Sequence, residues 1–397
     1  INNALGNNTL VTFDDVSGYA TEVKDGEGNI FRFTYDPRAL SNGIVEYDLV
    51  RADYPDGSFE TWVYDNFGNF TTYTDAAGHD WAYTYDAMGN VLTETNPASG
   101  VTTYTYLADG NLDTIKDPAG NVIDHDYDTA GRLVLTKLPD TSERSFSYDD
   151  NDNLLTRTDE NSIDLVRSYD KNNNRKESGD GDTAVVDMSY DGMDRLSGLA
   201  PPEGNPSSIA YDSFGRIATL TGPDGNVLTY TYDSRGRLTS LDDNAGNIWT
   251  ATFDDAGRKT SEKNALGHTT TFTYDDADRL IQLTDPEGTV HQLEYDGMDR
   301  ITSSTVGGRT TSFKYEGRGL VEDITIAPGV DTQIVYDGLG RIQQATDAGG
   351  NQWSFTHDSS GRTVTSVDPL SRATTYEYDN RNRHDKTVFP SSMGTLD

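Results

Sequence analysis

Aromatic and polar residues alternate along much of the chain, and this pattern predicts short β-strands. In Tyr83-Thr84-Tyr85 and in Tyr230-Thr231-Tyr232, two aromatic rings are separated by one threonine. Residues two apart lie on the same face of a strand, so the rings share one face and the threonines share the other. No segment places apolar residues at the 3.6-residue period of an amphipathic helix, so we expect no substantial helix.

An aromatic residue, followed in most copies by aspartate, recurs at a fixed distance and anchors a repeat. The spacing is 21 residues eleven times running from Tyr64 to Tyr295, then 20 residues once, then 21 three more times. One inserted residue would turn all later side chains of a strand to the opposite face, so this spacing indicates that every unit packs on its neighbour in the same way. The anchors are Tyr64, Tyr85, Tyr106, Tyr127, Tyr148, Tyr169, Tyr190, Tyr211, Tyr232, Phe253, Tyr274 and Tyr295.

Two turns divide each repeat into two strands of about six residues, the usual strand length. The anchor turn follows the aromatic residue and reads Asp-x-x-Gly-Arg or Asp-x-x-Gly-Asn; the distal turn, as in residues 117–121, reads Asp-x-x-Gly-Asn. Aspartate can accept hydrogen bonds from backbone N–H groups two residues on, and glycine supplies a positive φ, so each unit is predicted to be a β-hairpin. Representative anchor-turn residues are Asp128, Gly131, Arg132, Asp233, Gly236 and Arg237.

The first strand of the repeat alternates less cleanly than the second. Leu238 and Leu241 are three residues apart. This spacing implies either a β-bulge or a strand buried on both faces, and the sequence does not choose between them.

The domain prediction is one repeat array over residues 1–397, with about 18 hairpin units. The step from Tyr35 to Tyr64 is 29 residues, and counting back from Tyr64 places Gly57 in its distal-turn position, so the extra residues fall near 36–43 and predict a longer loop there. Both ends fall within a repeat, so we expect an excerpt of a longer array. Some 36 strands at ~4.8 Å each would make a ribbon on the order of 170 Å long. A twisted sheet of that size curls, so the predicted fold is all-β, with one antiparallel sheet coiled as a spiral shell or tube.

The composition narrows the classes of partner. The formal net charge of −35 argues against binding to nucleic acid or to an anionic membrane, because both need a basic surface. The chain has no cysteine, which excludes disulfides and cysteine-ligated metals. No run approaches the ~18 apolar residues of a membrane-spanning helix.

The repeated Tyr-Asp-x-x-Gly-Arg-Leu, as in residues 127–133 and 232–238, resembles the YD repeat of Rhs proteins. Similar repeats occur in wall-associated bacterial proteins, Tc-toxin C components and teneurins, and the resemblance covers essentially the whole chain. It implies a hollow β-shell that, in the bacterial toxins, encloses a C-terminal toxin. Such shells usually end in an Asp-Pro-containing self-cleavage segment, which is not found after Tyr378.

Each candidate site has a structural alternative. The aspartates one residue after the anchors could form a Ca²⁺ ladder, but they lack the dense Asp-x-Asp-x-Asp loops of calcium sites, so turn capping is favoured and no cofactor is expected. The Tyr/Trp face could bind a sugar, but its recurrence in every unit favours packing between repeats. The six histidines occupy mostly different repeat positions, and no catalytic or metal-binding residues stand out, so we expect no enzyme.

The leading functional hypothesis is a structural shell from a secreted or surface-associated bacterial protein that carries a C-terminal toxin or effector. Its partners would be that effector or neighbouring subunits. The alternative is an extracellular filament or adhesin built as an open β-tube, with glycans as ligands.

Overall fold

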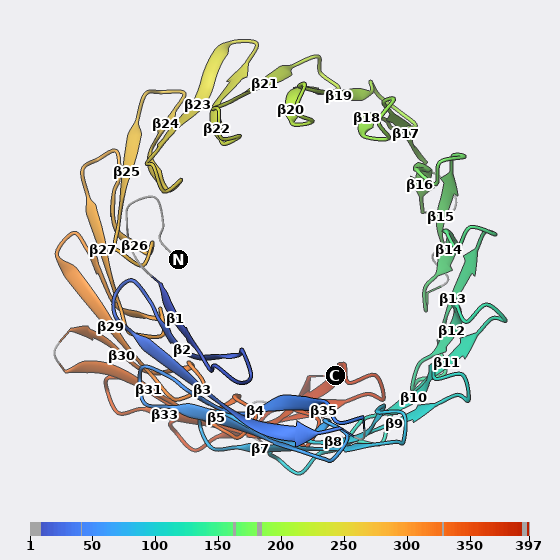
Figure 1. The fold of residues 1–397 in the computed structure, drawn as a ribbon, viewed down its shortest axis with the longest axis vertical. Helices are drawn as coiled ribbons and strands as arrows, with labels where there is room; N and C mark the ends of the chain where they lie inside the picture. The colour runs from blue at the N-terminus through green and yellow to red at the C-terminus, as the bar shows by residue number, and fades with distance from the viewer. Residues whose placement is uncertain are drawn as a thin grey trace. The chain divides into compact units, whose positions relative to one another are not determined.

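The structure is a computed structural model that describes residues 9–40, 42–161, 164–180, 185–327, 329–390 and 395–396. By their contacts, residues 1–122 and 272–397 form one compact unit, and residues 123–271 form a second. Each unit is a ribbon of β-hairpins, drawn in Figure 1.

The first unit contains strands from both ends of the chain. These strands are β1 (Leu10–Phe13), β2 (Ala20–Lys24), β3 (Ile30–Ala39), β4 (Val45–Asp53), β5 (Phe59–Tyr64), β6 (Phe70–Thr74), β7 (Asp80–Tyr85), β8 (Val91–Thr95), β9 (Val101–Tyr106), β10 (Leu112–Lys116), β26 (Leu280–Thr284), β27 (Val290–Tyr295), β28 (Ile301–Val306), β29 (Arg309–Tyr315), β30 (Val321–Ala327), β31 (Val330–Tyr336), β32 (Ile342–Thr346), β33 (Gln352–His357), β34 (Thr363–Val367), β35 (Ala373–Tyr378), β36 (His384–Val388) and β37 (Thr395–Leu396).

The second unit contains the middle strands, of which β11 and β25 reach its two boundaries. They are β11 (Val122–Tyr127), β12 (Leu133–Lys137), β13 (Glu143–Tyr148), β14 (Leu154–Thr158), β15 (Asp164–Tyr169), β16 (Arg175–Gly179), β17 (Val186–Tyr190), β18 (Leu196–Ala200), β19 (Ser207–Tyr211), β20 (Ile217–Thr221), β21 (Val227–Tyr232), β22 (Leu238–Asp243), β23 (Gly246–Phe253), β24 (Lys259–Asn264) and β25 (Thr269–Tyr274).

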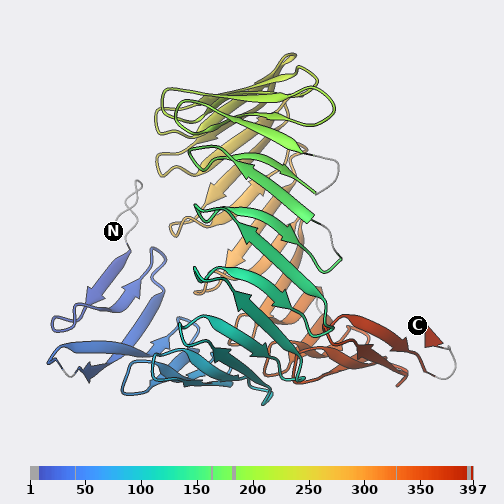
Figure 2. The same ribbon diagram turned by 90° about the vertical axis from the view of Figure 1, so that its right-hand side faces the viewer.

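Within each unit, every strand pairs antiparallel with the strand before it and the strand after it in the sequence. Figure 2 shows the strands of the second unit following one another as a ribbon, with turns along both edges. The described residues form no helix, and so none that could cross a membrane. The prediction of an all-β fold built from antiparallel 21-residue hairpins is therefore confirmed.

The anchor turns share one backbone geometry, which explains their glycine. In the turn after Tyr232, the Gly236 N–H donates to the Asp233 carbonyl oxygen at 3.0 Å, and the Asp233 N–H donates to the Arg237 carbonyl oxygen at 3.0 Å. Gly236 has φ +84°. This is a type I turn followed by a left-handed residue, a common three-residue hairpin loop in which the fourth residue must tolerate a positive φ. Where glycine is absent, aspartate or asparagine replaces it, as at Asp194 with φ +58°.

A β-bulge explains the irregular spacing of the leucines. Tyr232 lies opposite Leu238, whereas Thr231 lies opposite Ser240, so β22 carries one extra residue at this point. Tyr230 then lies opposite Leu241, which places both leucines beside the aromatic face. The same shift occurs at the anchor in other repeats, such as those ending at Tyr64 and Tyr148. Of the two alternatives that the sequence left open, the bulge is the correct one.

The prediction of a longer loop near residues 36–43 is wrong. The extra residues instead lengthen the hairpin of β3 and β4, whose pairing continues through Pro37 opposite Tyr47 to Ala39 opposite Val45. The turn itself keeps its usual size, because the Leu40 N–H donates to the Ile44 carbonyl oxygen. Extended pairing satisfies backbone groups that a loop would leave to water, which favours the longer strands. Residue 41 lies outside the described residues.

The single 20-residue step has a local cause in the distal turn between β28 and β29. Val306 pairs directly with Arg309, so only Gly307 and Gly308 form the loop. Both glycines have positive φ, 55° and 82°. A two-residue hairpin loop requires this conformation, and glycine pairs supply it. One residue is thus removed inside the turn, and the strands on both sides keep their register.

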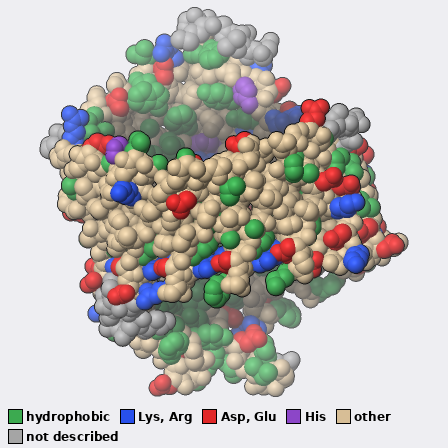
Figure 3. Space-filling model, turned by 90° about the horizontal axis from the view of Figure 1, so that it is seen from above, with side chains coloured by type: hydrophobic (Ala, Val, Ile, Leu, Met, Phe, Trp, Pro, Cys, Tyr) green, Lys and Arg blue, Asp and Glu red, His purple; other side chains and the backbone are tan. Residues whose placement is uncertain are grey.

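Few side chains are fully buried, as expected of a sheet with exposed faces. Among the described residues, the buried apolar ones are Ala52 and Ala251. Tyr83 and Tyr85 are half-buried, and Thr84 between them is exposed. Figure 3 shows a face on which uncharged side chains and backbone predominate, with acidic and basic side chains along its edge. The ordering of the repeats therefore depends on contacts made along the ribbon, more than on a thick core.

We predict that the Gly236→Ala substitution destabilises the protein by about 1–2 kcal/mol, because an L-residue is strained at positive φ. The matched control is Gly192→Ala, at a glycine without a positive φ and with open space around its Cβ direction. The free energy of unfolding of that variant should lie within about 0.5 kcal/mol of the wild-type value or be slightly higher, because alanine restricts the unfolded chain. Urea unfolding measures both, and equal losses in the two variants would contradict the turn assignment.

Candidate functional site: the anchor turns and the seam

The aspartate that follows most anchors caps its own turn. Asp233 Oδ1 accepts hydrogen bonds from the N–H groups of Arg235 at 2.9 Å and Arg237 at 3.0 Å, and Asp233 Oδ2 accepts one from Arg237 Nε at 2.7 Å. Asp128 makes the same contacts with its own turn, including Arg132 Nε at 2.8 Å. The hydrogen bonds from the Arg237 backbone and side chain hold the pKa of Asp233 below its usual value. Each carboxylate therefore already has several donors.

Where an anchor turn ends in arginine, as at Arg132 and Arg237, that side chain also reaches the next repeat. Arg237 Nη1 donates to the carbonyl oxygen of Asp254 at 3.0 Å, and its guanidinium lies 4.6 Å from the centre of the Phe253 ring. Arg132 bonds to the Asp149 carbonyl oxygen at 2.8 Å and lies over the Tyr148 ring in the same way. One arginine side chain thus joins the aspartate of its own turn to the anchor of the next repeat. This contact fixes the position of one repeat against the next.

The anchor tyrosines form a second ladder through their hydroxyl groups. The Tyr232 hydroxyl donates to the Ile217 carbonyl oxygen, 15 residues earlier, at 2.9 Å. Tyr315 donates to Ile301, only 14 residues earlier, because the glycine-pair turn between them is one residue shorter. The sequence analysis treated these rings as packing groups and missed this role. The same 15-residue bond is made by Tyr85, Tyr106, Tyr148, Tyr169, Tyr190, Tyr211, Tyr295, Tyr336 and Tyr378.

The predicted anchor residues therefore lie in a ladder and do not converge on one centre. Each is the last residue of its strand, from Tyr64 in β5 to Tyr295 in β27. Gly131 and Gly236 hold the positive-φ positions of their turns. Among the described residues, no group of three or more His, Asp or Glu side chains is arranged to hold a metal ion. The anchor residues are thus spread along the ribbon, with one set in each repeat.

A carboxylate that the sequence analysis did not single out bridges two tyrosines on the aromatic face. Glu60 Oε2 accepts a hydrogen bond from the Tyr54 hydroxyl, and Glu60 Oε1 accepts one from the Tyr73 hydroxyl, both at 2.7 Å. Tyr73 also stacks on Trp62, with ring centres 5.6 Å apart. Burial and the hydrogen bond to Glu60 raise the pKa of both tyrosines. Four half-buried side chains are fixed here: two come from β5, one from β6, and Tyr54 from the turn between β4 and β5.

Two hollows on the first unit bear on the glycan alternative. One, of about 320 Å³, is lined by Trp62, Tyr64 and the pair Arg38–Asp48, whose Nε–Oδ2 distance is 2.7 Å. The other, of about 810 Å³, lies beside the glycine-pair turn and is lined mainly by apolar and threonine side chains. Aromatic rings beside charged groups, as in the smaller hollow, are compatible with sugar binding.

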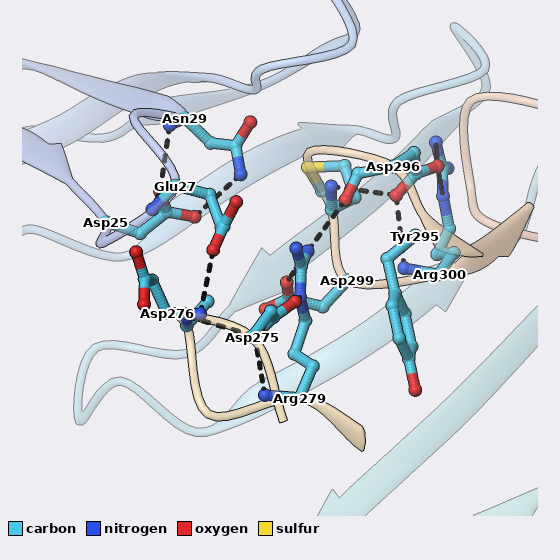
Figure 4. A network of polar contacts seen from close by, with 12 residues as sticks. Asp25, Glu27, Asn29, Asp275, Asp276, Arg279, Tyr295, Asp296, Asp299 and Arg300 are labelled. Carbon is cyan, nitrogen blue, oxygen red and sulfur yellow. Dashed lines mark hydrogen bonds and ion pairs between the residues drawn. The ribbon is translucent and has the colours of Figure 1, made fainter. Parts of the chain in front are cut away.

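In the first unit, two distant stretches of the ribbon meet edge to edge along a line that we call the seam. Distal turns near the N-terminus contact anchor turns near the C-terminus, as Figure 4 shows for Glu27 and Asp276. The Asp276 N–H donates to Glu27 Oε1 at 3.0 Å, and Arg300 Nη2 lies 2.8 Å from Asp56 Oδ2. At the far end, Asn382 Nδ2 donates to Asp117 Oδ2 at 3.0 Å. These bonds join residues 244, 249 and 265 positions apart.

Glycines permit the close approach at the seam. A Cβ on Gly297 would lie 2.8 Å from Pro55 Cβ, and one on Gly338 would lie 3.0 Å from Pro97 Cβ. A Cβ on Gly317 would overlap the Ala76 carbonyl oxygen. None of these three glycines has a positive φ, so the backbone does not require them. Their role is to let a second backbone come near.

The histidines contribute individual contacts. His79 lies in a seam turn, with Nδ1 3.3 Å from Asp75 Oδ1. His357 takes the place of an anchor aromatic, and its Nδ1 lies 3.4 Å from Asp337 Oδ2. Burial lowers the pKa of His357, with Arg341 acting in the same direction. These rings serve different turns, in keeping with their scattered repeat positions.

Comparison with known proteins gives two matching families. The teneurin YD-shell family matches residues 164–295, and the RHS repeat family matches residues 64–102, 127–162 and 336–367. No curated protein matches the chain.

Two solved structures have the same fold at low sequence identity. A Photorhabdus luminescens Tc holotoxin pore structure matches 96% of this chain and 27% of its own chain, with a TM-score of 0.65 and 13% identity. A TcdB2-TccC3-Cdc42 crystal structure matches 94% of this chain and 23% of its own, with a TM-score of 0.55 and 14% identity. The chain thus spans about a quarter of the length of these relatives.

Because the capping aspartates are ionised in the folded protein, we expect the protein to lose stability in acid. Their pKa values are lowered in the folded protein, as for Asp128, Asp191 and Asp233. Their contribution to the stability of the folded state is therefore complete above the unfolded pKa of about 3.9. It is lost as the pH falls through the folded values. We expect the urea midpoint to be nearly constant from pH 7 to pH 5 and to fall below about pH 4.

The Asp233→Asn variant tests this assignment at one turn. Asparagine keeps an oxygen acceptor for the turn N–H groups but loses the ion pair with Arg237. The variant should be less stable than the wild type at pH 7, and the difference should shrink in acid. A stability difference between the variant and the wild type that stays the same down to pH 3 would contradict the capping role of Asp233.

Proposed function

Because the chain belongs to the YD-repeat (Rhs-repeat) family, we propose that it is a structural part of the shell of a secreted or surface-associated bacterial protein. In this proposal it has no enzymatic role, and it encloses or carries a C-terminal toxin or effector. The observation that carries the proposal is the fold match over 96% of the chain to a Tc holotoxin structure. The partners would be the effector and neighbouring subunits of the same assembly.

The seam gives this proposal support from the chain itself. A flat ribbon would bring no residues 244 to 265 positions apart into contact, whereas a wound ribbon does so edge to edge. The glycines at Gly297, Gly317 and Gly338 indicate that the sequence is adapted to this contact. Lateral contacts of this kind close the gaps between successive stretches of ribbon, which a container requires.

The charged groups of the surface favour a structural role over a catalytic one. The recurring carboxylates cap turns and hold arginines, and they are spread evenly along the ribbon. The net charge of −35 disfavours nucleic acid as a partner or cargo.

An extracellular filament or adhesin is the second candidate. It is favoured by the uniform 21-residue spacing, which would let the same winding continue without limit. The hollow beside Trp62 and Tyr64 would suit a glycan in that setting.

Electron microscopy of the purified protein separates the two candidates. We expect discrete hollow particles of limited size, and tubes of constant diameter and unlimited length would overturn the carrier proposal. The Gly317→Arg variant places a long side chain where the Ala76 carbonyl oxygen approaches, so it should open the particles along the seam. Ser234→Arg, at an exposed residue of the same repeat position outside the seam, is the matched control and should leave the wall of each particle intact.

We also propose that folding requires no bound metal. Asp233 already receives two backbone N–H groups and one guanidinium, whereas a Ca²⁺ ion needs 6–8 oxygen ligands. The melting temperature should be the same with EDTA and with added calcium. A melting temperature that EDTA lowers and calcium restores would establish a calcium ladder in place of simple turn capping.

A further inference from the structure

The anchor turn at residues 191–195, in the second unit, has the features of a seam turn, but no distal turn among the described residues lies against its glycine. Gly192 has no positive φ, and no described atom lies within 4 Å of the position that its Cβ would take. The next residue, Met193, is 75% exposed. Neither backbone conformation nor local packing therefore accounts for a glycine followed by a large apolar side chain at this turn.

The same six residues, Tyr-Asp-Gly-Met-Asp-Arg, occur at positions 190–195 and 295–300. In the second copy, the seam shows what covers them. Pro55 of a distal turn lies against Gly297, and Asp56 of that turn pairs with Arg300 Nη2 at 2.8 Å. Met298 is half-buried there, whereas Met193 is exposed. The covered copy thus defines the kind of surface that fits the uncovered one.

The adjacent anchor turn extends this uncovered surface. Phe214 occupies the same repeat position as Met193, one repeat later, and is 83% exposed. In the seam, the residues at this position, Met298 and Leu339, are half-buried. Two neighbouring turns therefore present a methionine and a phenylalanine along one edge, a larger apolar patch than scattered surface residues produce.

We propose that the turn at residues 191–195, together with Phe214, is a docking site for a distal turn of a second copy of this chain. The docked turn would carry proline followed by an acidic residue, as Pro55-Asp56 does in the seam. Its proline would lie against Gly192 and Met193, and its carboxylate would pair with Arg195. Arg195 is held in position by Asp191, with an Nη2–Oδ2 distance of 2.6 Å.

The chain offers such turns on its own surface. Exposed proline–acidic pairs occur at Pro202-Glu203, Pro223-Asp224 and Pro286-Glu287, all in distal turns. In the seam, a distal turn meets an anchor turn 244 to 265 residues later. These exposed turns carry the same proline and acidic residue as Pro55-Asp56, so a second copy of the chain can supply the docked turn. This inference does not depend on what the shell carries.

Sedimentation velocity over a range of protein concentrations tests the proposal. The net charge of −35 opposes association, so the measurement is made at about 0.15 M salt, where exposed charges are screened beyond about 8 Å. We expect the mass to rise from 43.6 kDa toward twice that value. The double variant Gly192→Asp with Met193→Asn should weaken association at least about tenfold, as loss of a central contact does.

The variant is designed to fold, because it recreates a turn that the chain already contains. Asp150 and Asn151 occupy these two positions in the turn at residues 149–153. The matched control is Thr129→Asp with Ala130→Asn, at a turn of the same unit without the glycine–methionine pair, and it should associate like the wild type. A wild type that stays monomeric, or a control that loses association equally, would overturn the proposal.

Cross-linking then identifies the docked turn. The chain has no cysteine, so Met193→Cys introduces a single thiol. A reagent that joins thiols to carboxylates should link it to Glu203, Asp224 or Glu287 of a second copy. Links only to carboxylates elsewhere would contradict the assignment of the partner turn, even if dimers form.

Discussion

The hydrogen bonds of one carboxylate per repeat determine much of this structure. Asp233 holds the N–H groups of its own turn and, through its second oxygen, the guanidinium of Arg237. That guanidinium then reaches the backbone and ring of the next repeat. Because almost no side chain is fully buried, a hydrophobic core cannot set the distance between repeats. The backbone ladder of the sheet sets that distance, and charge-assisted bonds at its edge reinforce the contact between repeats.

The repeated features could be predicted from sequence because their causes are local. A turn that needs a positive φ favours glycine, aspartate or asparagine at one position, and alternating aromatics favour a strand. The bulge beside Leu238 was within reach, since three-residue spacing admitted it as one of two explanations. The β3–β4 hairpin was misread because extra residues can enter a loop or lengthen a strand pair, and Pro37 favoured the wrong choice.

The contacts between distant repeats could not be predicted in the same way. The seam joins residues about 250 positions apart, and nothing in one repeat states which other repeat lies beside it. A signal was nevertheless present at Gly297, Gly317 and Gly338, which stand where the turn does not need glycine. Comparing each repeat with the consensus, residue by residue, would have separated these glycines from the obligatory ones. The ladder of tyrosine hydroxyl bonds could have been found by counting residues, since the acceptor, such as Ile217, lies directly after the preceding anchor turn.

The residues that depart from the repeat are therefore the ones that distinguish one part of the ribbon from another. Glu60 joins two tyrosines that other repeats leave separate, and Gly307-Gly308 shortens one turn without disturbing its neighbours. Such changes stay local because each repeat contacts mainly the next.

The strictly sequential pairing of strands also has a mechanical consequence. Each strand is bonded only to its chain neighbours within the ribbon, so a force pulling on one free end would load one hairpin at a time. Backbone bonds would then break in succession, as in a zipper, with the tyrosine hydroxyl bond at the mouth of each distal hairpin as the first to resist. Along the seam, the peeling hairpin must in addition release a second stretch of ribbon. A wall of this design resists pressure across its face but can be unravelled from its edge.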